Sequence, residues 1–439
     1  MTPKPADQDA TDPVRVALLG CGNVGGALAE LLTARQDDIA ARTGIRLDLV
    51  GIAVANMDRP RPSGIAPEQF TTDSAALAVR DDVEVVVELI GGLHPAQELI
   101  SAALRAGKSV VTGNKTVLAV AGAELAELAA AHGVDLLYEA AVAGAIPVVR
   151  ALRESLAGEQ IVRVMGIVNG TTNFILTRME EDGVDFDAAL ADAQRLGLAE
   201  RDPTADVDGH DAAAKAAILA ALAFGSDVVD AEVHREGIRG IRAVDVAYAN
   251  RLGYTVKLLA VAELVDGGPE LSVRVHPAMV PKSHPLASVR GAFNAVFVEG
   301  AGSGEIMLYG RGAGGPPSAS AVLGDLVDAS RNRRAGAPAP APKRTSISMR
   351  PQLDLRSAFY LSMDVADRPG VLAAVAKVFG DHQVSIRAME QVGLADEARL
   401  IFLTHLAREG DLLATIDELR LLQAVDRVSG VLRVIGEEE

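Results

Sequence analysis

A lysine and an aspartate that could perform acid–base chemistry stand four residues apart in the segment Gln194–Phe224. Lys215 is the one charged residue among the alanines, leucines and isoleucine that follow Asp211, in a helix that we expect to be capped by Asp208. Side chains four residues apart lie on the same face of a helix. A helix that is apolar on every side is buried, so we expect a desolvated lysine held by a carboxylate, which prepares a proton donor or acceptor. The alternative is a surface ion pair that contributes about 0.3–0.5 kcal/mol.

Two long motifs carry a resemblance to a known family. The sequence GLAERDPTADVDGHDAAAK at residues 197–215, with NGTTNFIL at Asn169–Leu176, resembles homoserine dehydrogenases. The resemblance extends from about Val14 to about Val327. It implies reversible hydride transfer between NAD(P)H and L-aspartate 4-semialdehyde, which gives L-homoserine in the biosynthesis of threonine, methionine and isoleucine. The cofactor carries the hydride in such a reaction, while the protein orients the carbonyl and delivers a proton.

We assign roles at this site from the motif together with the resemblance. Lys215 is the expected proton donor to the developing alkoxide, and Asp211 is expected to position it. Glu200 would bind the substrate ammonium, and Gly197 would help through its backbone. Lys115 would lie near the reacting oxygen.

A glycine-rich sequence, GCGNVGG, follows the short apolar run Val14–Leu19 and precedes an Ala/Leu helix pattern. Strand, turn and helix in this order, with glycines in the G-x-G-x-x-G register, are typical of a dinucleotide-binding turn. A glycine-rich connector without a ligand is the alternative. Because this strand begins so early, the resemblance implies a monofunctional enzyme without a preceding aspartate kinase region. The residues expected to contact the cofactor are Gly20, Gly22, Asn23, Val24 and Gly25.

The choice between the two nicotinamide cofactors depends on the end of the second strand, Leu47–Ala55. An NAD site usually places Asp or Glu there to accept from the ribose hydroxyls. Here Asn56 follows the strand, and Arg59 and Arg61 come shortly after it. Arginines suit a 2′-phosphate, so NADP is favoured. Asp58 keeps NAD possible, and the arginines could equally lie in a solvated loop beside two prolines.

Further apolar runs at Val83–Leu89, Ser109–Thr112 and Leu136–Ala141 continue a βαβ series and predict a parallel sheet. Lys115 follows the carboxyl end of one of these strands, where open α/β sheets bind ligands. A lone lysine in a loop is usually solvated. By position, however, Lys115 and Gly314 match residues that lie near the cofactor in homoserine dehydrogenases.

Glu139 lies inside the last of these apolar runs and therefore needs a polar partner. From the residues alone we expect it to be hydrogen-bonded. The resemblance implies a sodium ion here, held by the Glu139 side chain and by the backbone carbonyls of Val142, Gly144 and Ile146. Oxygen ligands of this kind suit hard cations.

From Arg150 onward the pattern changes to that of a mixed α+β domain. We expect a helix at Val149–Leu156, and a last helix at Ser320–Ala329 that packs back on the nucleotide domain. The expected strands of this second domain include Ile161–Val168, Leu271–His276 and Ala295–Glu299.

The C-terminal tail reads as β-α-β-β-α-β, which is the order of a ferredoxin-like fold. The sequence DRPGVL at the start of its first helix resembles the ACT domain, an amino-acid-sensing module. Asp367 and Gly370 are the expected effector residues, because a glycine before a helix N-terminus lets a carboxylate approach backbone N–H groups. ACT modules commonly form effector sites where two of them meet. A module that only oligomerises is the alternative.

We expect L-threonine, the pathway product, to be the effector. The sequence predicts that a shortened chain ending near Ala341 keeps activity and loses inhibition by threonine. The expected organisation is a flexible tail (1–13), a Rossmann-like NAD(P)-binding domain (14–148 with 312–330), a catalytic α+β domain (149–311), a linker (331–357) and an ACT domain (358–436).

Composition narrows the function classes. The chain has 439 residues, of which 49% are hydrophobic, enough for about three domains with buried cores. A formal net charge of −17 disfavours nucleic acid and anionic membranes as partners, and 3% aromatic residues without Trp disfavour base stacking. The single cysteine, Cys21, indicates a reducing compartment, so we expect a cytoplasmic protein. A homodimer or higher homo-oligomer is a family expectation.

Two rival functions stay open at this point. A phosphorylating semialdehyde dehydrogenase would need a cysteine nucleophile, and Cys21 lies inside the dinucleotide turn, where it cannot serve. A catalytically inactive amino-acid sensor could use the same domains. The set Lys215, Asp211 and Glu200 argues against the sensor, and an assay of NADPH oxidation with the semialdehyde would decide.

Overall fold

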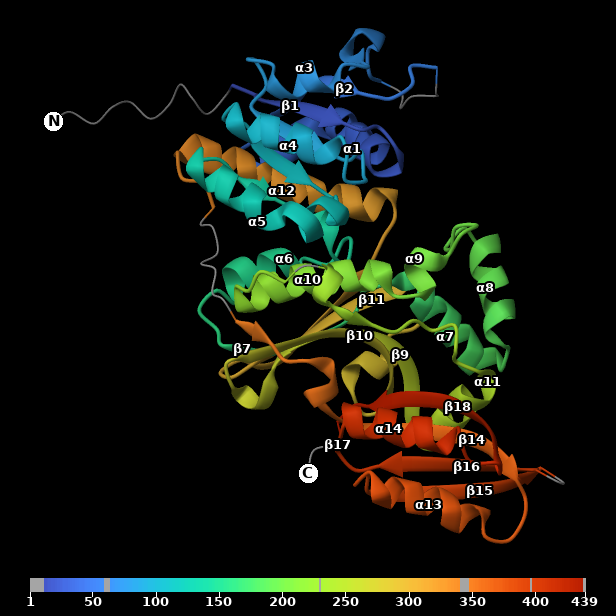
Figure 1. Ribbon diagram of the computed structural model, residues 1–439. Helices are drawn as coiled ribbons and strands as arrows, with labels where there is room; N and C mark the ends of the chain where they lie inside the picture. Colours follow the sequence, from blue (N-terminus) through green and yellow to red (C-terminus); the bar gives the residue numbers. More distant parts are fainter. Residues whose placement is uncertain (1–11, 59–63, 229, 340–346, 395–396, 437–439) are drawn as a thin grey trace. The chain divides into compact units, whose positions relative to one another are not determined.

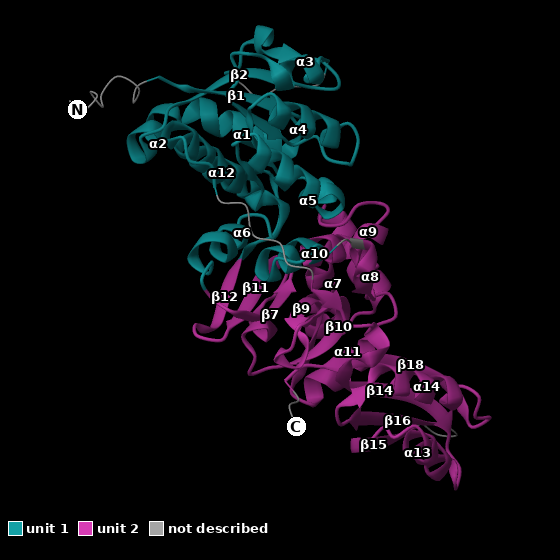
Figure 2. Cartoon of the chain, turned by 60° about the vertical axis from the view of Figure 1, so that its left-hand side comes forward, with its two compact units in different colours: residues 1–158, 217–230, 310–345 teal, residues 159–216, 231–309, 346–439 magenta. Residues whose placement is uncertain are grey.

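The computed structural model describes residues 12–58, 64–228, 230–339, 347–394 and 397–436. The chain divides into two compact units (Figure 2). Within the described residues, no helix combines the length and the apolar character needed to cross a bilayer. Unit 1 consists of Met1–Gly158, Ala217–Asp230 and Gly310–Thr345, and unit 2 of Glu159–Ala216, Ala231–Tyr309 and Ser346–Glu439.

A parallel sheet forms the centre of unit 1, with the strand order β3-β2-β1-β4-β5-β6. Two of its strands, β1 and β2, are labelled in Figure 1. Its residues are buried on both faces because helices cover both sides, as the apolar runs in the sequence predict. The strand order reverses beside β1, which is where open sheets of this class bind ligands. The strands are β1 (Val14–Leu19), β2 (Leu47–Ala53), β3 (Phe70–Thr71), β4 (Val85–Glu88), β5 (Ser109–Thr112) and β6 (Leu136–Leu137).

The helices of unit 1 include the predicted last helix, which is longer than expected. It is α12, and it runs from Gly315 to Ala335 rather than over Ser320–Ala329. Its residues Val322 and Leu326 share a core with β1, so the predicted packing on the nucleotide domain is confirmed. The other helices are α1 (Asn23–Ala34), α2 (Gln36–Thr43), α3 (Ser74–Val79), α4 (Ala96–Arg105) and α5 (Lys115–Ala131).

The prediction of a strand at Leu136–Ala141 is wrong in its second half. Only Leu136–Leu137 pairs in the sheet, and Glu139–Ala141 forms a 3₁₀ turn. The backbone leaves the sheet because the Glu139 N–H donates to the Asp325 carboxylate of α12, at 2.7 Å. The expected helix 149–156 is also split: α6 (Val148–Arg150) continues as a π-helical turn, Ala151–Ser155.

Unit 2 contains a mixed sheet with the order β12-β11-β7-β9-β10-β18-β14-β16-β15. Helices pack on this sheet. The second half of α10 and the last residues of β12 belong to unit 1 rather than to unit 2. The strands before the C-terminal module are β7 (Ile161–Ile167), β8 (His234–Arg235), β9 (Tyr254–Leu264), β10 (Glu270–Pro281), β11 (Phe293–Gly300) and β12 (Gly304–Arg311). The helices are α7 (Gly170–Asp182), α8 (Phe186–Arg195), α9 (Thr204–Val207), α10 (His210–Phe224) and α11 (Ala243–Arg251).

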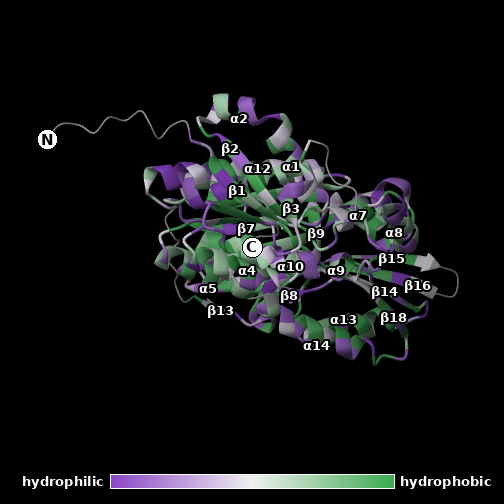
Figure 3. Cartoon of the chain, turned by 90° about the horizontal axis from the view of Figure 1, so that it is seen from above, coloured by the Kyte–Doolittle hydropathy of each residue, from purple (hydrophilic) through white to green (hydrophobic). Residues whose placement is uncertain are grey.

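The C-terminal module has the predicted β-α-β-β-α-β order. Its two long helices pack on the sheet and against each other, and both carry hydrophobic and hydrophilic residues, as Figure 3 shows. Such amphipathic helices are expected where one face covers a sheet. The elements are β14 (Arg356–Ala366), α13 (Val371–Asp381), β15 (Ile386–Leu394), β16 (Glu397–Thr404), α14 (Glu409–Leu419) and β18 (Val425–Val434).

The module is joined to the rest of unit 2 by strand pairing, which the sequence did not predict. β18 pairs in parallel with β10, through Ala278 with Arg433 and Met279 with Val434. The described part of the expected linker is structured as well, because β13 (Ser348–Met349) also pairs with β10. Residues 340–346 lie outside the described residues. Such short pairings show no readable period in the sequence, so only the tertiary structure reveals them.

Candidate active site

Lys215 and Asp211 lie side by side on α10, and both are buried. Lys215 is 8% exposed and Asp211 is 7% exposed, so the alternative of a surface ion pair is excluded. The Lys215 ammonium donates to Asp211 Oδ2 at 2.6 Å and to the Val168 carbonyl at 2.7 Å. An ammonium has three N–H donors. Within the described residues two of them are used, which leaves one donor for the oxygen of a ligand.

Asn169 holds the aspartate of this pair, a role that the sequence analysis missed. Its side-chain amide donates to Asp211 Oδ2 at 2.9 Å and to Asp206 Oδ1 at 2.7 Å. Its side-chain oxygen accepts from the Thr172 N–H at 2.9 Å and thereby caps α7. The signal was present in the NGTTNFIL motif, because an Asn between a buried strand and a helix is a typical N-cap.

The expected cap of the helix that carries Asp211 and Lys215 is wrong. α10 begins at His210, so Gly209 directly precedes it, and Asp208 instead ends α9. Asp208 accepts a hydrogen bond from Arg239 Nε at 2.5 Å. Gly209 has a φ of +82°, a conformation that lets the chain turn sharply between the two helices.

The expected substrate residues Gly197 and Glu200 lie in the loop between α8 and α9, in the same unit as Lys215. Both are exposed, and Gly197 has a φ of +72°. The Glu200 carbonyl accepts from Gln194 Nε2 at 3.0 Å, which fixes the loop backbone. The Glu200 carboxylate makes no ion pair with any residue that the structure describes, so it can accept an ammonium from a ligand.

The glycine turn has the geometry of a dinucleotide site. Gly20 has a φ of +99°, and a Cβ on it would lie 2.6 Å from the Leu89 carbonyl oxygen. A Cβ on Gly25 would lie 2.1 Å from the Gly20 carbonyl oxygen. Gly22 directly precedes α1, whose first residues are Asn23 and Val24. Only glycine fits at Gly20 and Gly25, and the N–H groups of the helix start can face an anion.

Other expected cofactor residues of unit 1 gather near this turn or at the same edge of the sheet. A Cβ on Gly315, the residue after Gly314, would lie 2.8 Å from Asn23 Oδ1, so Gly314 is brought to the start of α1. Lys115 is the first residue of α5, after the carboxyl end of β5. The Asn114 side chain caps that helix and donates to the Gly92 carbonyl at 2.7 Å. Arg59 and Arg61 lie outside the described residues.

Glu139 is buried at 4% exposure, and its partners are backbone groups. Its two carboxylate oxygens accept from the N–H groups of Val149 at 2.9 Å and Arg150 at 2.8 Å. Burial raises the pKa of the Glu139 carboxyl. Burial likewise raises the pKa of Asp325 to about 7. Within the described residues, no cluster of three or more His, Cys, Asp or Glu side chains could hold a metal ion.

Asp367 and Gly370 line a cavity of about 360 Å³ in the C-terminal module. Gly370 has a φ of +91° and directly precedes α13, so the helix N-terminus faces this cavity. Asp367 is exposed, and its carboxylate accepts from Gln391 Nε2 at 3.4 Å. N–H groups and a carboxylate at one cavity match the two charged groups of a free amino acid.

A doubly wound nucleotide domain with a glycine turn, together with a buried acid–base pair in a second domain, defines an NAD(P)-dependent oxidoreductase. The family model for homoserine dehydrogenase matches residues 147–327. The model for the homoserine dehydrogenase NAD-binding domain matches residues 20–139, and the ACT domain model matches residues 359–420. ACT domains typically bind amino acids.

Named relatives agree with these matches. The chain is 50% identical over 425 residues to a homoserine dehydrogenase of Corynebacterium glutamicum, covering 96% of this chain and 95% of that one. The crystal structure of a homoserine dehydrogenase from Thiobacillus denitrificans is similar with a TM-score of 0.90 and 40% identity, over 96% of this chain and 98% of that one. The structure of a hyperthermophilic archaeal homoserine dehydrogenase in complex with NADPH is similar with a TM-score of 0.61 and 29% identity. This similarity covers 73% of this chain and 98% of that one. The chain therefore belongs to the homoserine dehydrogenase family.

Proposed function

We propose that this enzyme reduces L-aspartate 4-semialdehyde to L-homoserine, and catalyses the reverse reaction, with Lys215 as the proton donor. The observation that carries this proposal is the buried Lys215–Asp211 pair with one ammonium donor left. The bound nicotinamide supplies a hydride to the aldehyde carbon. Lys215 gives a proton to the aldehyde oxygen as that oxygen becomes an alkoxide, and Asp211 and Asn169 keep the ammonium in place.

The substrate's other end is proposed to bind in the Gly197–Glu200 loop. The exposed Glu200 carboxylate suits the ammonium of an amino acid, and Gly197 leaves backbone groups accessible. Lys115 at the carboxyl edge of the nucleotide sheet is proposed to lie near the reacting oxygen. Oxidation of NADPH by the purified chain, with and without the semialdehyde, tests the activity. No turnover would favour the amino-acid sensor instead.

This reaction lies on the route to threonine, methionine and isoleucine. We place the enzyme in the cytoplasm, because a chain with a single cysteine, Cys21, is typical of a reducing compartment. Cell fractionation with an antibody against the chain checks this location.

NADPH is expected to give a higher kcat/KM than NADH. β2 ends at Ala53, the exposed Asn56 follows it, and the sequence then supplies Arg59 and Arg61 for a 2′-phosphate. Loss of one charge-assisted hydrogen bond of about 1.5–3 kcal/mol corresponds to roughly a 10- to 100-fold drop in the NADPH/NADH ratio of kcat/KM. Arg59→Ala and Arg61→Ala are compared with Arg42→Ala, an exposed arginine of α2. If the NADPH/NADH ratio of kcat/KM is unchanged in Arg59→Ala and in Arg61→Ala, the two arginines do not select the cofactor.

We propose a sodium ion beside Glu139. Its donors would be the Glu139 carboxylate and the carbonyls of Val142, Gly144 and Ile146, which form an all-oxygen set that suits a hard cation. Each Glu139 oxygen has a second lone pair beyond its N–H bond, and a cation would keep the buried carboxyl ionised. The melting temperature in NaCl should exceed that in tetramethylammonium chloride at equal ionic strength. A Glu139→Gln variant should have the same melting temperature in the two salts. If the wild type and the variant respond equally to NaCl, the proposed sodium site is wrong.

We propose that L-threonine inhibits the enzyme by binding the cavity at Asp367 and Gly370. A coupling of about 1–3 kcal/mol, roughly 5- to 150-fold in affinity, is typical of allosteric pairs. Asp367→Asn should weaken inhibition because it removes the charge that pairs with the effector ammonium. Asp381→Asn, at the opposite end of α13, is the matched control. Equal inhibition in both variants, or none in the wild type, would contradict the proposal.

The structure changes the expectation for a chain shortened to Ala341. Such a chain lacks β14 and β18, so the β10 edge and the buried Arg274 and His276 would lose their cover. Exposed edges and unpaired buried charges destabilise and promote aggregation. We therefore expect the shortened chain to be unstable rather than active. Inhibition by threonine is better tested with the full-length variants Asp367→Asn and Asp381→Asn.

A homodimer is proposed from the outer edge of the sheet in unit 2. β12 has β11 as its only neighbour in the sheet among the described strands, and its residues are partly or fully exposed. Tyr309 is 53% exposed and stacks on Phe293 with ring centroids 5.1 Å apart. An open edge with apolar side chains suits pairing with a second copy. Sedimentation of a monomer at micromolar concentration would contradict this assignment.

A further inference from the structure

The segment 236–242 runs between the C-terminal module and the turn that precedes the catalytic helix. We call it the connecting segment. It follows β8, is held to β10 by the Glu236 N–H, which donates to the Val275 carbonyl at 2.8 Å, and leads into α11. All of it belongs to unit 2, as do Asp211, Lys215 and the module.

One side of the connecting segment holds the turn between α9 and α10 through its backbone. The Ile238 N–H donates to the Val207 carbonyl at 2.8 Å. A Cβ on Gly237 would lie 2.3 Å from the Val207 carbonyl oxygen and 2.6 Å from the Asp208 Cα. The two backbones are thus in direct contact, and only glycine permits this approach.

Arg239 adds side-chain contacts to the same turn. Its Nε donates to Asp208 Oδ1 at 2.5 Å, and its Nη2 donates to Thr204 Oγ1 at 3.3 Å. Arg239 therefore clamps both ends of α9. α10, which carries Asp211 and Lys215, begins at His210, two residues after Asp208.

The other side of the connecting segment binds the module. Arg433 of β18 forms an ion pair with Glu236 at 2.8 Å. Arg242 lies 3.6 Å from the Asp364 carboxylate of β14. Asp364 directly precedes Val365, the first residue that lines the effector cavity. The segment thus contacts the catalytic turn and the effector module at once.

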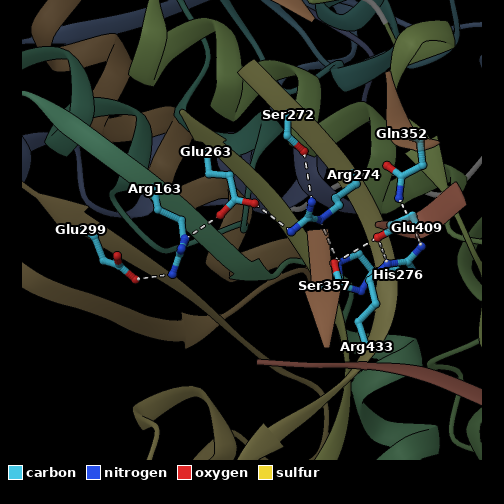
Figure 4. Close-up of polar contacts among 10 residues, drawn as sticks. All are labelled: Arg163, Glu263, Ser272, Arg274, His276, Glu299, Gln352, Ser357, Glu409 and Arg433. Atoms are coloured by element: carbon cyan, nitrogen blue, oxygen red, sulfur yellow. Dashed lines mark hydrogen bonds and ion pairs between the residues drawn. The ribbon is translucent and has the colours of Figure 1, made fainter. Parts of the chain in front are cut away.

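Arg433 itself belongs to a buried network. Figure 4 shows it beside Glu409 and His276, with Arg274 next to them. Glu409 is 2% exposed and His276 is 0% exposed. Each buried charge of this network needs its partner. Arg433 contacts both Glu409 and Glu236, so a change in the position of Arg433 acts on the connecting segment as well.

We propose that the connecting segment sets the position of the Asp211–Lys215 helix from the C-terminal module, and that Arg239 is a positioning residue for the reaction. The inference rests on the proposed role of Lys215. Proton transfer depends on placement within a fraction of an ångström, so a looser turn lowers the rate without removing any reacting group.

Arg239→Gln in the full chain tests the clamp. Misplacement by about 1 Å can cost about 10²-fold in rate, so partial loosening is expected to lower kcat by about tenfold. The KM for NADPH should stay within about twofold, because the glycine turn that binds it lies in unit 1 and keeps its contacts. The Arg239 side chain is 46% exposed, and exposed ion pairs add little stability, so the melting temperature should not change.

Arg251→Gln is the matched control. The Arg251 side chain is 52% exposed and forms an ion pair with Glu390 of the module. Among the residues that the structure describes, no hydrogen bond or ion pair joins Arg251 to the turn at 204–209. Hydrogen exchange of residues 204–212 should be faster in Arg239→Gln and unchanged in Arg251→Gln. The same kcat in both variants would overturn the positioning role. Full turnover by Lys215→Ala would instead contradict the proposed role of Lys215 as proton donor. In that case the hydrogen-exchange rates of residues 204–212 would still test whether Arg239 holds the turn in place.

Glu236→Gln tests the link to the module. It keeps the size of the side chain and removes the charge that pairs with Arg433, so kcat should fall in the same direction as in Arg239→Gln. Glu270→Gln is its control, because Glu270 on β10 pairs with Arg350 at similar exposure and away from the connecting segment. Equal kcat in Glu236→Gln and Glu270→Gln would overturn the link to the module.

Discussion

Replacement of Lys215 by alanine is expected to lower kcat by about 10²–10⁴-fold, the usual contribution of a positioned acid or base. The ammonium is buried, donates to Asp211 Oδ2 and the Val168 carbonyl, and has one donor left within the described residues. Alanine cannot supply the proton, and burial keeps water from replacing it. The affinity for NADPH, measured by fluorescence titration, should stay near that of the wild type because the glycine turn is untouched.

Lys108→Ala serves as the control for this experiment. Lys108 is also 8% exposed, and its ammonium donates to a backbone carbonyl, that of Asp81. Loss of a buried lysine should therefore destabilise both variants, whereas only Lys215→Ala should lose turnover. A Lys215→Ala chain with nearly the wild-type kcat would remove Lys215 from the proton-transfer step. Lys215→Arg should not restore the rate, because the planar guanidinium cannot place a single donor as an ammonium does.

Replacement of Arg433 by methionine is expected to lower the free energy of unfolding by about 3–5 kcal/mol, the usual cost of removing one partner of a buried ion pair. Arg433 is 7% exposed and donates to both oxygens of Glu409, at 2.6 and 2.5 Å. Its ion pair with Glu236 is 2.8 Å long. The variant leaves the buried Glu409 without its counter-charge. Denaturant unfolding at neutral pH measures the loss.

Arg427→Met is the matched control on the same strand. The Arg427 side chain is 62% exposed, and its ion pair with Asp364 is 3.3 Å long. Exposed pairs contribute about 0–1 kcal/mol. Equal losses in the two variants would show that burial does not amplify the Arg433 network.

The same network should make the protein less stable in acid. Burial, together with the charges of Arg433 and Arg274, holds the pKa of His276 well below its usual 6.5. The unfolded chain therefore binds a proton near pH 6.5 that the folded chain does not bind, so stability falls as the pH drops through that value. Burial raises the pKa of Glu409, but hydrogen bonds and charge from Arg433 outweigh this effect and leave it below 4.5. A second loss of stability is therefore expected below about pH 4.5.

The sequence alone determined the features that depend on local spacing. The order of strand, glycine turn and helix predicted the nucleotide domain, because positive φ values and close backbone contacts require glycine at Gly20 and Gly25. The four-residue spacing predicted the Lys215–Asp211 contact, and the apolar helix around it predicted burial. The period of the C-terminal segments predicted the β-α-β-β-α-β module.

The tertiary structure decided which distant groups complete these local features. Val168 and Asn169, more than forty residues before α10, supply the other partners of Lys215 and Asp211, and no local pattern pairs them. The pairing of β18 with β10 and the network around Arg433 likewise join segments far apart in sequence. A buried charge requires a partner of opposite charge or a hydrogen-bonding group. The residues around a charged residue in the sequence indicate that it is buried and therefore needs such a partner. Only the folded chain shows which distant residue is that partner.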